Sequence, residues 1–478
     1  MRWCLVLLLA VLLGACGYDG PTVSQADRAA GAEMHPQLLA EFGGSYDGDE
    51  AAYVARVGDK IAVAAQLQGQ CTFTLVNSDV VNAFAVPGCY IYVTRGLMGV
   101  VNSEAELGSV LAHEIGHIAA RHPQRQQNRS IWRTLSVLAV QTLTGSERLT
   151  QIAGAAAAYF TLRYSRGQEY EADDVGLDLL TKAGYDPHAS VEMLEALGRQ
   201  EQFLTKTRGR DEARSIPEWA RTHPLTGSRV ARAEKAAAAT GIAEGQLPEK
   251  ELPYLRSVDG MLYGDDPEQG FVIGRTFAHP VMRIAFEAPE GFTLTNSPHA
   301  ILIEGPSGMR GEFSGGRTSA GGLDVYTQGL LRNLLGKAPV AIEEAEPLVV
   351  NGVPSLLTRA TVQTREGPAS LWVAAYAAGA GEAYHFLMLS NSGSAAPEAL
   401  GRLFASFRLI GEAEARTLRP RRIHVVAAGA ADSWQTLARR MAGPNPRDHL
   451  LMLNGRTAAQ GPKPGELIKL VVYGDGDR

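Results

Sequence analysis

The spacing of apolar residues along the first half of the chain predicts helices around a small sheet. Residues 24–68 carry Tyr53, Val57 and Ile61 on one face at helical spacing, so we expect helix there. Short runs rich in β-branched and aromatic residues predict strands over residues 72–76, 82–86 and 90–94. Helical patterns return over residues 103–121, 167–183 and on to about 240. We therefore expect a mostly helical domain with a small β-sheet over residues 24–250.

Past Pro253 the pattern changes, because glycine and proline become frequent and strand-like runs dominate. Strands are predicted over residues 281–286, 301–303, 356–363, 370–376 and 384–390. With a helix predicted over residues 397–405, this region is expected to form a separate α+β domain over residues 270–410. A basic linker leads from it to a last small module over residues 423–473. The expected class of the whole chain is α+β.

The first residues, 1–16, have the pattern of an export signal. Arg2 precedes an apolar run that is too short to span a bilayer of ~30 Å as a mature helix. The run ends in Leu13-Gly14-Ala15-Cys16, which resembles the lipobox of bacterial lipoproteins and implies that Cys16 becomes the lipidated first residue. Gly17, where an inner-membrane lipoprotein usually has Asp, implies the periplasmic face of the outer membrane. A plain secretory signal cut near Ala15 is the alternative.

Residues 131–162 form a second apolar stretch, which a polar segment at residues 144–148 interrupts. Neither half reaches the ~20 residues that a membrane-spanning helix needs. We therefore expect buried helices in this stretch, with membrane-grazing helices as the alternative, rather than membrane spans.

Composition narrows the class of protein but says little about its chemistry. The chain has 478 residues, of which 45% are hydrophobic and 20% charged, so a polytopic membrane protein and a wholly disordered chain are excluded. The net charge of −6 offers no overall basic field, and no nucleic-acid partner is expected. In an oxidising compartment Cys71 and Cys89 form either a disulfide or two separate buried thiols, and the sequence leaves both open.

The helix expected over residues 103–121 carries His-Glu-Ile-Gly-His at positions 113–117. Residues four apart share one face of a helix, so His113 and His117 can both bind one zinc ion through imidazole nitrogens. Zinc lowers the pKa of a bound water to about 7, and Glu114 is placed to take its proton. The alternative is a chance match with two packed histidines. Apolar neighbours argue against it, because burying polar groups without partners is costly.

A catalytic zinc site needs a third protein ligand and one open position. His122 lies five positions after His117, so on a continued helix it is expected to point away from the ligand face. The metzincin pattern requires Gly at position 120 and His at position 123. The chain has Ala120 and Pro123, which excludes that class.

A later helix offers the missing carboxylate. Glu169 and Asp173 lie four positions apart and share a face, whereas Glu171 points roughly the opposite way. Glu169 can therefore bind zinc while Asp173 accepts the free ring N–H of a ligand histidine. The alternative is a solvated acidic helix face, which the pairing with the histidine motif disfavours.

Together these motifs resemble the gluzincin family of zinc metallopeptidases that includes HtpX, the CAAX prenyl proteases and BepA. The matching segments are residues 82–88, 96–97, 113–117, 165–173 and 222–224, with Arg229. The resemblance covers residues 24–240 and implies one zinc ion per chain, bound by His113, His117 and Glu169. It implies Glu114 as the general base and Asp173 as the partner of a ligand histidine.

The resemblance also bears on residues beyond the metal ligands. It implies that His223 stabilises the oxyanion or occupies the open zinc position in a repressed state, and a helix-capping role before Pro224 is the alternative. Arg166 and Arg229 are taken as structural ion-pair residues. Cys89 stands where the family usually has a second glycine. An extended substrate is expected to add to the strand over residues 90–94.

The last module resembles a degenerate LysM module with a βααβ order. The matching segments are residues 423–429, 433–441, 453–455 and 464–470. This likeness implies binding to peptidoglycan, but Gly429-Ala430-Ala431 replaces the usual Gly-Asp-Thr, so protein contacts are the alternative. Residues 270–410 contain no residues that imply chemistry.

The sequence therefore predicts a zinc-dependent endopeptidase of the cell envelope, lipid-anchored through Cys16, that cuts misfolded or stalled envelope polypeptides. The alternative is a periplasmic chaperone or assembly scaffold with a largely repressed protease site.

Overall fold

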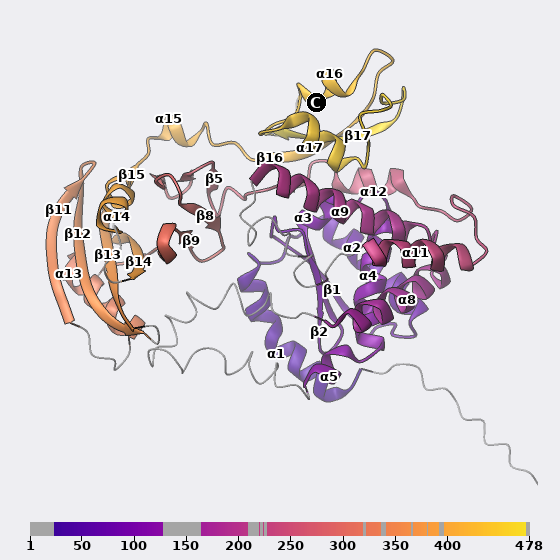
Figure 1. The fold of residues 1–478 in the computed structure, drawn as a ribbon, viewed down its shortest axis with the longest axis horizontal. Helices are drawn as coiled ribbons and strands as arrows, with labels where there is room; N and C mark the ends of the chain where they lie inside the picture. Colours follow the sequence, from indigo (N-terminus) through magenta and orange to yellow (C-terminus); the bar gives the residue numbers. More distant parts are fainter. Residues whose placement is uncertain are drawn as a thin grey trace, which may run out of the picture.

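A computed structural model describes most of the chain (Figure 1). The described residues are 23–127, 164–208, 219, 223, 227–318, 322–335, 341–364, 367–379, 381–391 and 396–474. The export signal predicted for residues 1–16 and the apolar stretch 131–162 lie outside them. Helices and several sheets confirm the predicted α+β class. Within the described ranges no helix is long and apolar enough to cross a membrane.

The first part of the chain is mostly helical, with one small sheet inside it. Its helices are α1 (Gln25–Glu41), α2 (Asp49–Ala64), α3 (Arg95–Val100), α4 (Glu104–Ala119), α5 (His122–Gln127), α8 (Arg166–Lys182), α9 (Ala189–Arg208), α11 (Gly227–Ala239) and α12 (Glu251–Val258). The helix expected over residues 24–68 is thus two helices, α1 and α2. In α2, Tyr53, Val57 and Ile61 are buried, as their common face predicts.

The three predicted strands are present as β1 (Thr72–Val76), β2 (Ala83–Val86) and β3 (Tyr90–Thr94). β1 runs parallel to β3 and β2 runs antiparallel to it, so the order across the sheet is β1-β3-β2. The expectation that a substrate adds to residues 90–94 is therefore wrong. Both edges of β3 are already paired, and only an edge strand has free backbone groups to offer.

A disulfide joins Cys71, which precedes β1, to Cys89, which precedes β3. This bond resolves the alternative that the sequence left open. The backbone of Cys89 has a φ of +59°, in the left-handed region that glycine adopts at little cost. The glycine that the motif resemblance implies at this position would adopt this φ without strain. Here a cysteine takes it and crosslinks two neighbouring strands.

The central helix α4 packs against α8, α2 and α9. Its approach to α8 is close because each helix has a glycine at the contact. A Cβ at Gly116 would lie 2.9 Å from the carbonyl oxygen of Ala172, and a Cβ at Gly176 would lie 3.0 Å from the backbone nitrogen of His113. Neither distance leaves room for a methyl group. The two glycines therefore set how near the residues of α8 come to those of α4.

The middle part of the chain forms two antiparallel sheets, drawn at the left of Figure 1. The seven-stranded sheet contains β8 (Thr293–Asn296), β9 (Ile301–Glu304), β10 (Arg310–Arg317), β11 (Ala341–Val350), β12 (Val353–Thr364), β13 (Gly367–Gly379) and β14 (Glu382–Asn391). The four-stranded sheet contains β5 (Phe271–Ile273), β6 (Thr276–His279), β7 (Ile284–Glu287) and β15 (Arg408–Leu409). The associated helices are α13 (Gly322–Leu335), α14 (Ala396–Ala405) and α15 (Glu412–Ala415), with a 3₁₀ turn η1 (Pro306–Gly308). All five strands predicted here correspond to strands of these sheets.

The last part contains β16 (Arg421–Ala427), α16 (Trp434–Ala438), α17 (Pro446–Leu453) and β17 (Leu467–Tyr473). β16 pairs antiparallel with β17, and β4 (Leu262–Tyr263) extends this sheet. Lys469 of β17 is fully buried, and its Nζ donates hydrogen bonds of 2.8 Å to the carbonyl oxygens of Gly99 and Val101. The module is thus bound to the chain segment that leads into α4. Its likeness to LysM stays a prediction.

Candidate metal centre

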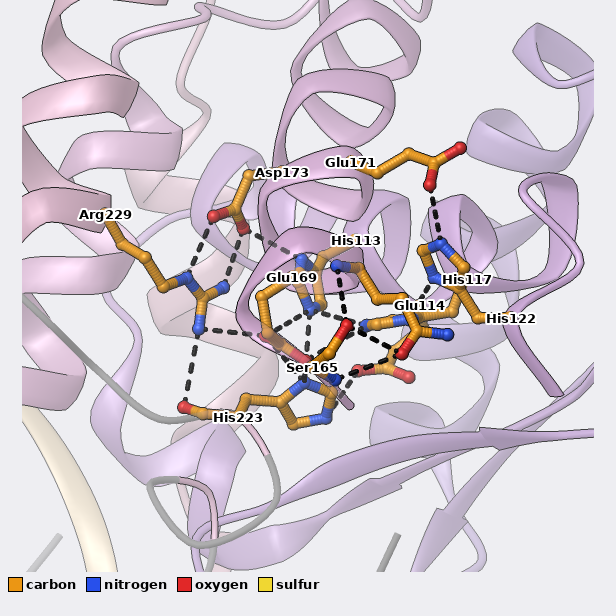
Figure 2. Close-up of polar contacts among 11 residues, drawn as sticks. His113, Glu114, His117, His122, Ser165, Glu169, Glu171, Asp173, His223 and Arg229 are labelled. Carbon is orange, nitrogen blue, oxygen red and sulfur yellow. Dashed lines mark hydrogen bonds and ion pairs between the residues drawn. The ribbon is translucent and has the colours of Figure 1, made fainter. Parts of the chain in front are cut away.

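Four side chains that sequence reasoning proposed for the site meet inside the helical part. His113 and His117 come from α4, Glu169 comes from the first turn of α8, and His223 lies between α9 and α11. One donor atom of each lies within 4.8 Å of the others, and all four side chains are buried (Figure 2). Ser165 caps α8 by accepting a hydrogen bond from the backbone of Gln168, which fixes where the helix starts and hence where Glu169 lies.

The distances among the donor atoms are those of a compact ligand set. Nε2 of His113 lies 3.1 Å from Nε2 of His117 and 3.2 Å from Nδ1 of His223. The carboxylate of Glu169 lies 3.1 Å from Nδ1 of His223, and 3.6 and 3.7 Å from the other two Nε2 atoms. Two donors at ~2.0–2.1 Å from one tetrahedral zinc ion are about 3.3–3.4 Å apart. The residues present therefore fit zinc in chemistry and in spacing.

Asp173 lies one turn after Glu169 and contacts the far side of the His113 ring. Its Oδ1 lies 3.0 Å from Nδ1 of His113. Burial alone would raise the pKa of Asp173, but hydrogen bonds from His113 and Arg229 outweigh it and hold the pKa below its usual range. A carboxylate can only accept, so the proton of His113 is on Nδ1 and the lone pair of Nε2 faces the donor set.

Arg229 of α11 holds both carboxylates of α8 in place. Its Nε and Nη2 donate to the two oxygens of Asp173 at 2.8 and 2.6 Å, and its Nη1 lies 3.1 Å from Oε2 of Glu169. The guanidinium is 1% exposed, so these are buried ion pairs. They favour the charged form of Glu169. Burial alone would raise the pKa of Glu169, but His223, His113 and Arg229 together lower it below its usual value. The ion-pair role expected for Arg229 thus acts directly on the site.

Glu114 lies beside the donor set rather than in it. Burial is the largest effect on the pKa of Glu114 and raises it to about 7. The charge of His113 lowers this pKa, and the charge of Glu169 raises it, each by less than burial does. Its Oε1 lies 3.6 Å from Nε2 of His223 and has no hydrogen-bond partner among the described residues. A buried carboxyl with this pKa can exchange a proton near neutral pH.

His122 lies outside the donor set, as predicted, but the expectation that it points away from α4 is wrong. The prediction assumed that the helix continues to residue 121, but α4 ends at Ala119 and Arg121 turns the chain with a φ of +55°. His122 then begins α5 and faces back toward α4. Its side chain is fully buried, and its Nδ1 lies 2.8 Å from Nδ1 of His117.

Two aromatic rings, which sequence reasoning missed, line the histidines. Tyr164 stacks on His117 with ring centroids 3.9 Å apart, and Trp219 stacks on His223 at 4.5 Å. Trp219 also donates its backbone N–H to the carbonyl of Val81, which precedes β2. Both residues lie in stretches without a clear periodic pattern, so no local signal marked them.

Comparison with known proteins supports the interpretation of this half of the chain. Residues 49–237 match Peptidase family M48, which confirms for this segment the metallopeptidase resemblance that the motifs carry. The beta-barrel assembly-enhancing protease of Yersinia pestis is 33% identical over 195 residues, which cover 39% of this chain and 38% of that protein. That of Escherichia coli K12 is 31% identical over 174 residues, or 34% of each chain. The mitochondrial metalloendopeptidase OMA1 of Arabidopsis thaliana is 35% identical over 125 residues, or 26% of this chain and 25% of that protein.

These matches leave the rest of the chain unassigned. The chain spans 38% of the Yersinia relative and 25% of the Arabidopsis relative. Among solved structures, that of the cyanobacterial PsbP protein of Synechocystis covers 29% of this chain at 11% identity, and its TM-score of 0.24 is too low to indicate a common fold.

Proposed function

Residues 49–237 form a peptidase family M48 domain, and from this premise we propose that the chain is a zinc-dependent endopeptidase of the cell envelope. The observation that carries the proposal is the buried donor set of His113, His117 and Glu169, at the spacing of zinc ligands. We assign these three residues as the ligands. A site of three protein ligands leaves one position open for catalysis.

We assign Glu114 as the general base. When bound, zinc polarises a peptide carbonyl and acidifies a water molecule. Glu114 follows the first ligand directly, and its raised pKa of about 7 suits a group that takes a proton from water and returns it to the leaving amine. Asp173 and Arg229 orient His113 and Glu169.

His223 is proposed to close the site in the resting state. Its Nδ1 is within the donor set, where it would fill the fourth position, and its Nε2 lies 3.6 Å from the carboxylate of Glu114. A ring in that place would compete with water for the metal and would contact the base. Substrate binding then requires His223 to withdraw, after which it can stabilise the oxyanion.

An extended substrate is proposed to lie along β2 instead of β3. β2 is an edge strand of the small sheet, and α4 packs against it. The backbone of Ala85 hydrogen-bonds Glu114, so this edge lies next to the proposed base. Main-chain hydrogen bonds to an edge strand would bind a polypeptide with little regard to its sequence. Such binding suits a protease that acts on misfolded or stalled polypeptides.

The same proposal includes location in the cell envelope, a lipid anchor on Cys16 and peptidoglycan binding by residues 423–473. They are supported by the sequence patterns at the two ends of the chain and, for the envelope, by relatives named beta-barrel assembly-enhancing proteases. A second function, an assembly scaffold whose protease site is largely repressed, is favoured by one observation. His223 lies where it would fill the open position.

Glu114→Gln separates the two functions. The endopeptidase proposal expects zinc to be retained and chelator-sensitive casein cleavage to be lost, because the amide cannot accept a proton. Glu195→Gln is the matched control, since Glu195 is half exposed on α9 and remote from the donor set in sequence. In a strain that lacks the gene, the endopeptidase proposal expects Glu114→Gln to leave the envelope defect uncorrected. Full complementation by Glu114→Gln would favour the scaffold, and a wild-type chain that binds no zinc would overturn the endopeptidase.

A further inference from the structure

A row of side chains connects the donor set to the protein surface through His117, His122 and Glu171 (Figure 2). Nδ1 of His117 lies 2.8 Å from Nδ1 of His122, and Nε2 of His122 lies 3.1 Å from Oε2 of Glu171. Both imidazoles are fully buried, whereas the side chain of Glu171 is 42% exposed. The row uses the nitrogen of His117 that faces away from the donor set.

The proton positions along this row follow from its outer end. Arg125 donates to both oxygens of Glu171, at 2.7 and 3.3 Å, and this ion pair holds the carboxylate in its ionised form. An ionised carboxylate can only accept, so Nε2 of His122 carries a proton and donates it. The ring of His122 is fully buried and the charge of Glu171 is already paired with Arg125, so the ring stays neutral. A neutral imidazole with its proton on Nε2 has a bare Nδ1 that accepts.

His117 must therefore donate through its own Nδ1, and its Nε2 is left without a proton. Asp173 imposes the same state on His113 directly. The two Nε2 atoms, 3.1 Å apart, then present two lone pairs to each other. A pair of acceptors at this distance repels unless a cation lies between them.

We propose that His122 and Glu171 position His117 for the metal by fixing the tautomer in which Nε2 is bare. This inference rests on the proposed zinc site and adds to it two residues outside the motif at positions 113–117. Tyr164 stacks on His117 and fixes the plane of the ring, but a stacked ring retains both tautomers. The hydrogen bond to His122 is the contact that chooses between them.

The arrangement depends on the turn at Arg121. Its positive φ ends α4 and starts α5 after a single reversal, so His122 reaches back to His117 from the next helix. Glu171 approaches from α8, on a different side from Glu169 and Asp173 of the same helix. α8 therefore supplies three carboxylates. Glu169 belongs to the donor set, Asp173 supports His113, and Glu171 supports His117 through His122.

The test compares two substitutions of His122 by their zinc dissociation constants, measured by competition with a chromophoric chelator. His122→Phe keeps a buried ring but removes the acceptor, and the expected loss of affinity is roughly 10–100-fold. His122→Asn places an amide oxygen near the position of Nδ1, so its affinity is expected to stay within about threefold of wild type. In the Co²⁺-loaded chains, the d–d absorption bands are expected to shift for His122→Phe only.

Glu171→Leu keeps the test decisive if His122→Phe does not fold, because Glu171 is partly exposed. It removes the acceptor at the outer end, and a loss of roughly 3–10-fold is expected because water can replace that acceptor. Arg199→Gln, which breaks a partly exposed ion pair on α9, is the control and should not change the affinity. The inference is overturned if His122→Phe, or Glu171→Leu in its place, binds zinc as tightly as wild type. It is equally overturned if His122→Asn loses as much affinity as His122→Phe. In each case the proposed function stands, provided that the wild-type chain binds zinc.

Discussion

Replacing Gly176 by alanine is expected to push α8 away from α4 and to weaken metal binding. A Cβ at this position would lie 3.0 Å from the backbone nitrogen of His113, 3.1 Å from its Cα and 3.2 Å from the carbonyl carbon of Ala112. All three atoms belong to the backbone of α4, so no side chain can rotate to make room. Ordinary contacts between such atoms are about 3.5–4.0 Å, and the helices must therefore separate by roughly 0.5 Å.

The separation acts on stability and on the metal site by different amounts. Overpacking of this kind costs ~1–3 kcal/mol, whereas exchanging glycine for alanine within a helix returns up to ~1 kcal/mol. The expected net loss of stability is thus between roughly zero and 3 kcal/mol. Glu169 and Asp173 move with α8 while His113 stays on α4, so a ligand set that needs placement within ~0.5 Å is disturbed. We expect the zinc dissociation constant to rise about 10-fold.

Gly167→Ala is the matched control for this prediction. Gly167 lies in the first turn of the same helix, and a Cβ there would meet no atom within 4 Å. Gly167→Ala should therefore raise the free energy of unfolding by up to ~1 kcal/mol, which appears as a slightly higher melting temperature, and should leave zinc affinity unchanged. Chelator competition and thermal unfolding of the metal-free chains measure both quantities. If Gly176→Ala binds zinc as tightly as Gly167→Ala, the glycine contact does not set the geometry of the site.

Three further predictions concern stability. Burial, and then the charge of Glu249, raise the pKa of Glu192 to about 8. A raised pKa contributes stability below the unfolded value near 4.5 that is lost as the pH rises through 8, so Glu192→Gln should raise the melting temperature near pH 9 and not near pH 4. Equal shifts at both would contradict this. Because Cys71 and Cys89 are 18 positions apart, replacing both by serine should cost ~3 kcal/mol in urea unfolding, and a loss below about 1 kcal/mol would refute the crosslink. Arg121→Gly should add about 1 kcal/mol, because glycine adopts a positive φ without penalty, and any loss of stability would argue against the turn.

The parts of the site that the sequence predicted share one property, which is that local spacing determines them. His113 and His117 are four positions apart on one helix, and so are Glu169 and Asp173, so each pair faces one way in any helix that contains it. The three strands of the small sheet were predicted for a similar reason. Their β-branched and aromatic residues form short runs between turns, and the structure gives β1 and β3 the predicted bounds.

The order of the strands is a different kind of information. Residues 90–94 have the composition of a strand wherever they lie in a sheet. Whether they lie at the edge or in the middle depends on pairing with β1 and β2 on either side. The chain passes from β2 directly to β3, but β1 comes beside β3 through a parallel pairing that no local pattern marks. The wrong choice of substrate strand follows from that missing long-range contact.

The error on His122 has the opposite origin, because it lies in a single turn of the backbone. Helical spacing extrapolates the position of a residue from its predecessors, and one non-helical residue invalidates everything after it. Pro123 indicated that α4 ends nearby, but not that Arg121 would take a positive φ and reverse the chain. Metal ligands can be found from regular spacing because they occupy regular elements. The groups that support them, such as His122, lie where those elements end, so finding them requires the conformation of the turn as well as the residue types.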